Sequence, residues 1–265
     1  MEKQQPNPKA KNVLLGGLAA LGIAAFKFKM FFLLLLKGGW VFLSKGLSMI
    51  IMIGVYTMVF GWVYAVMVVG LILIHEMGHY IFMKHFGLDP KLPVFIPFLG
   101  AYVAMDKMPP DQATSAWVSL AGPLIGGVTS VAFFYFGIMQ KSPILMAAGS
   151  TGCFLNLLQL LPAKPLDGGF VISAIARWVL IPGVFMVFAA AYFLQSPIFM
   201  LIGLIAAYSA YKTFKGGDLG ARDMINPATP MEKVLIGLAY FTLAGALGYV
   251  YFVSHNELIS FIPSK

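Results

Sequence analysis

Long apolar runs are the feature that most restricts how this chain can fold. A helix needs about 20 mostly apolar residues to cross a bilayer, and such runs recur along the 265 residues. We expect membrane-crossing helices near residues 46–60, 62–84, 114–137, 143–161, 183–195, 197–213 and 231–253. A shorter helix is expected over 168–181, ending before Pro182. The predicted fold class is therefore all-α, a polytopic transmembrane helix bundle.

The low share of charged residues supports a lipid environment. Only 11% of the residues are charged and 60% are hydrophobic, whereas soluble chains carry about a quarter charged residues. Such a chain cannot cover a globular surface with polar groups. Its net charge of +8 is attributed to membrane topology and anionic lipid head groups. We expect no nucleic-acid partner, because the aromatic residues lie in apolar runs rather than among Lys and Arg.

The chain is divided into three parts by its runs and motifs. Residues 1–45 are predicted to be an N-terminal interfacial or membrane segment, retained rather than removed as a signal peptide. Whether 13–36 crosses the membrane is left open. Residues 46–181 are predicted to be the membrane core that carries the polar motifs described below, and 182–265 to be C-terminal transmembrane helices.

Positive residues predict the orientation of this core. Lysines flank the apolar stretch from 46 to 84 on both sides, at Lys37, Lys45, Lys84 and Lys91. Because cytoplasmic loops are enriched in Lys and Arg, both ends of the stretch are expected on the cytoplasmic side. The next two spans cross the membrane outward and back, so Lys164 is expected on the cytoplasmic side as well. Two distant polar clusters therefore share one face of the membrane.

The first polar cluster is His75-Glu76-Met77-Gly78-His79, at the end of an apolar run. Residues four apart share a helix face, so both imidazoles can reach one Zn²⁺ at about 2.0–2.1 Å. Glu76 lies next to a ligand and can act as general base toward a metal-bound water. A chance pattern is disfavoured, because ionisable groups cost about 2.5–3.5 kcal/mol each in a membrane helix.

A catalytic zinc needs a third protein ligand and an open coordination position. Asp167 follows two prolines and precedes two glycines, at the end of an apolar run. The prolines break the helix and the glycines permit unusual backbone angles, so the carboxylate can project into the bundle. The alternative is an ordinary interfacial loop, since Asp-Gly is a common turn pair. We predict one zinc ion per chain, held by His75, His79 and Asp167.

These motifs resemble those of the site-2 protease family of intramembrane zinc metalloproteases. The residues at 75–79 fit the family's zinc motif, L-D-G-G at 166–169 fits its third-ligand motif, and A-G-P at 121–123 recurs in the span between. The similarity covers about 60–180, the three-helix catalytic core of the family. It implies hydrolysis of peptide bonds within or next to transmembrane segments of membrane proteins, as in regulated intramembrane proteolysis. The expected location is the cell membrane, multi-pass, with the active site toward the cytoplasm.

Two positions depart from the family pattern. Gly126 stands where the family often has Asn, and Gln159 stands at the Asn of a frequent N-L-L-P. In the family, an Asn near the second position helps to hold substrate or the developing oxyanion. The resemblance implies that this substrate-binding role falls to Asn156 or Gln159, and of the two we favour Asn156.

Residues 92–105 are rich in β-branched and aromatic residues, with Gly100 near the middle. We predict a short membrane-associated β-hairpin with its turn at this glycine. In similar proteins such a segment offers a strand edge to substrate by β-augmentation, so Gly100, Ala101 and Tyr102 are predicted to bind substrate. The alternative is an interfacial loop with no substrate role.

Other functions compatible with these motifs would require other ligands or an internal repeat. Another kind of membrane zinc peptidase would take its third ligand from a downstream Glu, and only Glu232 and Glu257 follow Glu76. A non-catalytic protein with a structural zinc would need four protein ligands, and three can be named. A transporter would carry repeated halves, and no repeat is found. Cys153 is the only cysteine, which excludes an intrachain disulfide; the oligomeric state is not determined.

Overall fold

A computed structural model describes residues 46–215 and 226–260 of the chain. The predicted interfacial segment, 1–45, lies outside the described residues. From Met49 onward, the described residues form one compact unit. The helices are α3 (Leu47–Phe60), α4 (Trp62–His85), α5 (Gln112–Met139), α6 (Pro143–Gln159), α7 (Asp167–Ile175), α8 (Leu180–Phe193), α9 (Pro197–Lys215) and α10 (Pro230–Ser260).

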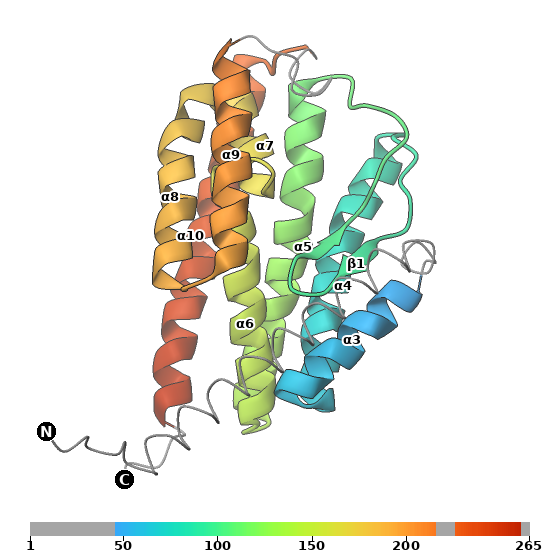
Figure 1. Ribbon diagram of the computed structural model, residues 1–265, viewed down its shortest axis with the longest axis vertical. Helices are drawn as coiled ribbons and strands as arrows, with labels where there is room; N and C mark the ends of the chain where they lie inside the picture. Colours follow the sequence, from blue (N-terminus) through green and yellow to red (C-terminus); the bar gives the residue numbers. More distant parts are fainter. Residues whose placement is uncertain (1–45, 216–225, 261–265) are drawn as a thin grey trace, which may run out of the picture. The chain divides into compact units, whose positions relative to one another are not determined.

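The helices confirm the predicted all-α, polytopic class. Among the described residues, α4, α5, α9 and α10 are long and apolar enough to cross a membrane. Helix α5 packs along both α4 and α6, and α10 packs against α5, α6 and α7 (Figure 1). Fully buried side chains at these contacts include Leu120, Phe134, Met146, Ile236 and Leu247.

Small residues bring α5 and α6 into backbone contact. A Cβ added at Gly149 of α6 would lie 2.4 Å from the backbone nitrogen of Phe134. One added at Gly137 of α5 would lie 2.6 Å from that of Met146. Transmembrane helices associate through such close approach, because lipid offers no hydrophobic driving force between them. The glycines therefore set the spacing of the two helices.

The predicted helix over 168–181 is wrong at its C-terminal end. Helix α7 ends at Ile175, a 3₁₀ turn covers Arg177–Val179, and α8 begins at Leu180. Pro182 lies in the first turn of α8, where its missing N–H is not needed for a helical hydrogen bond. The predicted division of the chain between 181 and 182 consequently falls inside α8.

A two-stranded antiparallel sheet is present within 92–105, as predicted. Strand β1 (Val94–Ile96) pairs with β2 (Gly100–Tyr102), with Phe95 opposite Ala101. The turn lies at residues 97–99 rather than at Gly100, which has φ 99° and begins β2. Phe95 is buried against Met52 of α3 and Val69 of α4, and this contact holds the hairpin against the bundle.

Ion pairs join the two chain segments that enter and leave the hairpin. Lys91 Nζ lies 2.5 Å from Asp106 Oδ1, and Lys107 Nζ lies 2.7 Å from Asp89 Oδ2. The hydrogen bond and the charge of Asp89 raise the pKa of Lys107. These side chains are exposed, so the pairs add little to the stability of the fold.

Candidate metal centre

Two buried imidazoles of α4 meet at one point. His75 and His79 lie one helical turn apart, and their Nε2 atoms are 3.1 Å from each other. The spacing of four residues places both rings on the same face of the helix. Two ring nitrogens at this separation can both contact one atom or ion placed between them.

The second nitrogen of each ring is fixed by a hydrogen-bond acceptor. His75 Nδ1 donates to Asn156 Oδ1 of α6 at 2.8 Å, and His79 Nδ1 donates to the carbonyl oxygen of Val118 in α5 at 2.8 Å. A proton on Nδ1 leaves the lone pair of a neutral ring on Nε2. In both rings Nδ1 is hydrogen-bonded and Nε2 faces the other ring, an arrangement typical of histidine in metal sites.

The A-G-P motif of α5 makes room for these rings. A Cβ added at Gly122 would lie 2.3 Å from His79 Nε2 and 2.8 Å from His75 Nε2. On the other side of the contact, a Cβ at Gly78 of α4 would lie 2.4 Å from Ala121 O. Pro123, inside α5, lacks the N–H that would close the helical hydrogen bond in this turn. The motif is a close-approach surface for α4, a role that sequence reasoning did not assign.

Asp167 completes the cluster from the first residue of α7. Its Oδ2 lies 3.2 Å from His75 Nε2 and 3.3 Å from His79 Nε2. This oxygen is buried and has no hydrogen-bond partner among the described residues. Ligands about 2.0–2.1 Å from a tetrahedral zinc lie about 3.3–3.4 Å from one another. The near-equilateral triangle of two nitrogens and one oxygen therefore fits zinc.

The end of α6 and the start of α7 are held together by close contacts. A Cβ at Gly168 would lie 2.1 Å from Leu160 O, and one at Gly169 would lie 2.3 Å from the backbone nitrogen of Lys164. Both glycines are helical, so they serve close approach rather than the unusual backbone angles expected from the sequence. Tyr240 of α10 donates its hydroxyl hydrogen bond to Leu160 O. These contacts set where Asp167 emerges.

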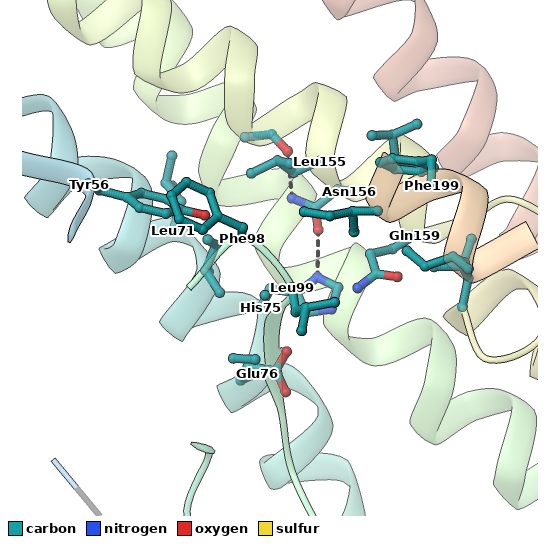
Figure 2. Close-up of a pocket in the computed structure, with 18 residues that line it drawn as sticks. Tyr56, Leu71, His75, Glu76, Phe98, Leu99, Leu155, Asn156, Gln159 and Phe199 are labelled. Carbon is teal, nitrogen blue, oxygen red and sulfur yellow. Dashed lines mark hydrogen bonds between the residues drawn. The ribbon is translucent and has the colours of Figure 1, made fainter. Parts of the chain in front are cut away.

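Glu76 lies where two cavities meet. The first, of about 150 Å³, is mainly apolar, and its walls include Tyr56, Leu71, Phe98, Leu155 and Phe199 (Figure 2). The second, of about 180 Å³, is more polar and includes the Asp167 side of the metal centre. The residues common to both cavities are His75, Glu76, Ala101 and Gln159. The cluster of His75, His79 and Asp167 is therefore bordered by both an apolar and a polar cavity.

The predicted substrate-binding residues surround this junction. Gly100 lines the first cavity, Tyr102 the second, and Ala101 both. Gln159 borders both cavities and Asn156 borders the first, while both polar atoms of the Asn156 amide are bonded within the protein. The alternative third ligands lie elsewhere: Glu232 accepts hydrogen bonds from Thr229 at the start of α10. Among described residues, His75, His79 and Asp167 are the only group whose ligand atoms converge in this way.

Comparisons with known proteins agree with this centre. Residues 63–145, which cover most of α4 and all of α5, match the model of peptidase family M50. Zinc metalloprotease MJ0392 of Methanocaldococcus jannaschii is 28% identical over 109 residues, 39% of this chain and 31% of that protein. The Arabidopsis thaliana protein named "Probable zinc metalloprotease EGY1, chloroplastic" is 29% identical over 115 residues, 42% of this chain and 20% of that protein.

The matched segments have clear limits. The chain spans less than a third of the length of these curated relatives. The family match contains both imidazoles, Glu76 and the A-G-P motif, while Asp167 lies beyond it. Helices that could cross a membrane and a zinc-protease family match together identify a multi-pass membrane protein. The resemblance to the site-2 protease family, peptidase family M50, is therefore confirmed over the segment that carries the His-Glu-x-x-His motif.

Proposed function

We propose that this protein is an intramembrane zinc metalloprotease that hydrolyses peptide bonds within or next to transmembrane segments of membrane proteins. One observation carries the proposal: three ligand atoms lie 3.1–3.3 Å apart beside Glu76, at the junction of an apolar and a polar cavity. A closed structural site would need a fourth protein ligand. Relatives over the same segment are named zinc metalloproteases.

The metal ligands proposed are His75 Nε2, His79 Nε2 and Asp167 Oδ2, with one zinc ion per chain. When bound, zinc supplies a Lewis acid for the scissile carbonyl and lowers the pKa of bound water to about 7. The protein keeps the two rings in the ligand tautomer through their Nδ1 hydrogen bonds. The buried Asp167 oxygen, which has no hydrogen-bond partner among the described residues, supplies the negative charge.

Proton transfer is assigned to Glu76. Its carboxylate takes a proton from the attacking water and gives it to the leaving amine. Gln159, at the junction of the cavities, is assigned to the carbonyl oxygen of the scissile bond, because a side-chain amide can donate a hydrogen bond to a developing oxyanion. Asn156 is not assigned this role, since both of its polar atoms have partners within the protein.

Substrate is proposed to bind as an added β-strand. Strand β2 pairs only with β1 in the described part of the chain, so its other edge has no strand partner. An extended peptide could pair there along Gly100, Ala101 and Tyr102, with apolar side chains in the first cavity. This arrangement would deliver an unwound segment to Glu76. The proposed location is the cell membrane, with the active site on the cytoplasmic side favoured by Lys84 and Lys91.

The test pairs metal analysis with cleavage by the purified, reconstituted chain. A panel of single-span membrane proteins is incubated with the parent and with Glu76→Gln. We expect cleavage and one zinc per chain in the parent, and zinc without cleavage in the variant. Glu232→Gln makes the same chemical change at the start of α10 and should cleave as the parent does. Cleavage by Glu76→Gln at the parent rate would overturn the proposal, as would a parent that binds no zinc.

A further inference from the structure

Asn156 is placed between the metal centre and the backbone of its own helix. It is buried in α6, and its Oδ1 accepts the hydrogen bond from His75 Nδ1 at 2.8 Å. Its Nδ2 donates to the carbonyl oxygen of Gly152 at 2.8 Å. Figure 2 shows both bonds as dashed lines on one carboxamide. The Gly152 contact fixes which end of the amide faces the ring, so an acceptor is always presented to Nδ1.

Helix α5 leaves a space for this carboxamide. A Cβ added at Gly126 would lie 2.7 Å from Asn156 Oδ1 and 2.9 Å from His75 Cβ. Real Cβ atoms essentially never show contacts below 3.0 Å. Any side chain at 126 would therefore push either the carboxamide or the imidazole out of its position. Three helices, α4, α5 and α6, contribute one residue each to this contact.

We infer that Asn156 is a positioning residue for the zinc centre, acting through His75, and that Gly126 supplies the space that it requires. The inference rests on the proposed function, because it concerns the same metal. An acceptor on the outer nitrogen fixes the tautomer and the ring orientation and raises the basicity of the ligand nitrogen. Without it, the ring can rotate or carry its proton on Nε2, and either change removes the lone pair from the metal.

The two histidines differ in the partner of Nδ1, and this difference makes the role of Asn156 testable. The Nδ1 of His79 is bonded to a backbone carbonyl, that of Val118, which no substitution removes. The Nδ1 of His75 is bonded to a side chain. Position 156 is therefore the place where the outer hydrogen bond of a ligand can be deleted or replaced without touching the ligands.

The first experiment measures zinc affinity of the full chain in detergent, by competition with a chromophoric chelator. Asn156→Ala should lower the affinity about 10–100-fold, the usual cost of losing such an outer partner. Asn156→Asp keeps an acceptor for Nδ1 but loses the donor to Gly152 O, so it should recover part of the affinity that Asn156→Ala loses. Thermal unfolding of the metal-free proteins checks that both variants fold. Parent affinity in Asn156→Ala, or equal loss in Asn156→Asp, would overturn the inference.

The second experiment tests the space at Gly126. Gly126→Ala should also lower zinc affinity, and its effect should shrink in the Asn156→Ala background, where the carboxamide is gone. The matched control is Gly127→Ala, whose Cβ would meet only the flexible Leu247 side chain at 2.9 Å; it should bind zinc as the parent does. Additive effects of the two substitutions would show that Gly126 acts without Asn156 and would refute the pairing.

Failure of the inference and failure of the proposed function give different results. If the parent binds zinc and cleaves, and Asn156→Ala binds zinc equally well, only the positioning role of Asn156 is refuted. If the parent binds no zinc, both the positioning role and the proposed function are refuted.

Discussion

Replacing Gly122 by Ala should disable the metal centre without unfolding the protein. The added Cβ would lie 2.3 Å from His79 Nε2 and 2.8 Å from His75 Nε2, whereas ordinary contacts begin at 3.4 Å. The His79 nitrogen would have to move by about 1 Å, since atoms at such range repel steeply. Metal–ligand distances tolerate only about 0.2 Å, and a 1 Å misplacement can cost about 100-fold in rate. We expect losses of at least that order in zinc affinity and in cleavage.

The assay compares zinc affinity, by chelator competition, with the unfolding temperature of the metal-free protein. Gly70→Ala is the matched control, because a Cβ at Gly70 of α4 meets nothing within 4 Å. It should bind zinc as the parent does and be stabilised by about 0.5–1 kcal/mol through helix propensity. Zinc affinity of Gly122→Ala within a few-fold of the parent would refute the reasoning, as it would mean that the rings do not occupy the described positions.

Three further substitutions test the parts that support the centre. Asp167→Ala should lower the zinc content of the purified protein, and equal stoichiometry with the parent would exclude Asp167 as a ligand. Tyr240→Phe removes the donor to Leu160 O and should lower the free energy of unfolding by about 1–3 kcal/mol; an unchanged value would contradict this. Gly183→Ala places a Cβ 1.9 Å from Pro162 O and should cost about 1–3 kcal/mol, measured by thermal unfolding; no loss would mean that α8 can shift freely.

Much of the helical layout follows from periodicity and length alone. The runs at 62–84 and 197–213 correspond to α4 and α9 within about two residues. An apolar run that crosses a bilayer must be helical, because its backbone groups have no other partners. The error at 168–181 has a different origin. A proline ends one helix or starts the next, and a tertiary contact such as that of Gly183 with Pro162 cannot be read from the local sequence.

The hairpin was predictable in kind but not in register. Its β-branched and aromatic residues, bounded by prolines, favour strands. The sequence pointed to Gly100 as the turn, yet Phe98 has φ 67° and lies in it, while Gly100 starts β2. In the observed register Phe95 is buried against α3 and α4, and no local pattern contains this contact.

The sequence by itself determined the local arrangement: residues four apart share a helix face, so His75 and His79 lie on one face with Glu76 beside them, whatever the rest of the chain does. The tertiary structure decided everything that depends on contacts between helices. It brought Asp167 to the two rings across a separation of about 90 residues, and it bonded the Asn156 amide to the His75 ring while Gln159 lies at the junction of the cavities. It also shows the role of the glycines in α5, which is to let α4 and α6 approach closely. A missing Cβ has this effect only where a neighbouring helix packs against it. Periodicity is a property of one segment, whereas metal geometry is set by how several segments pack.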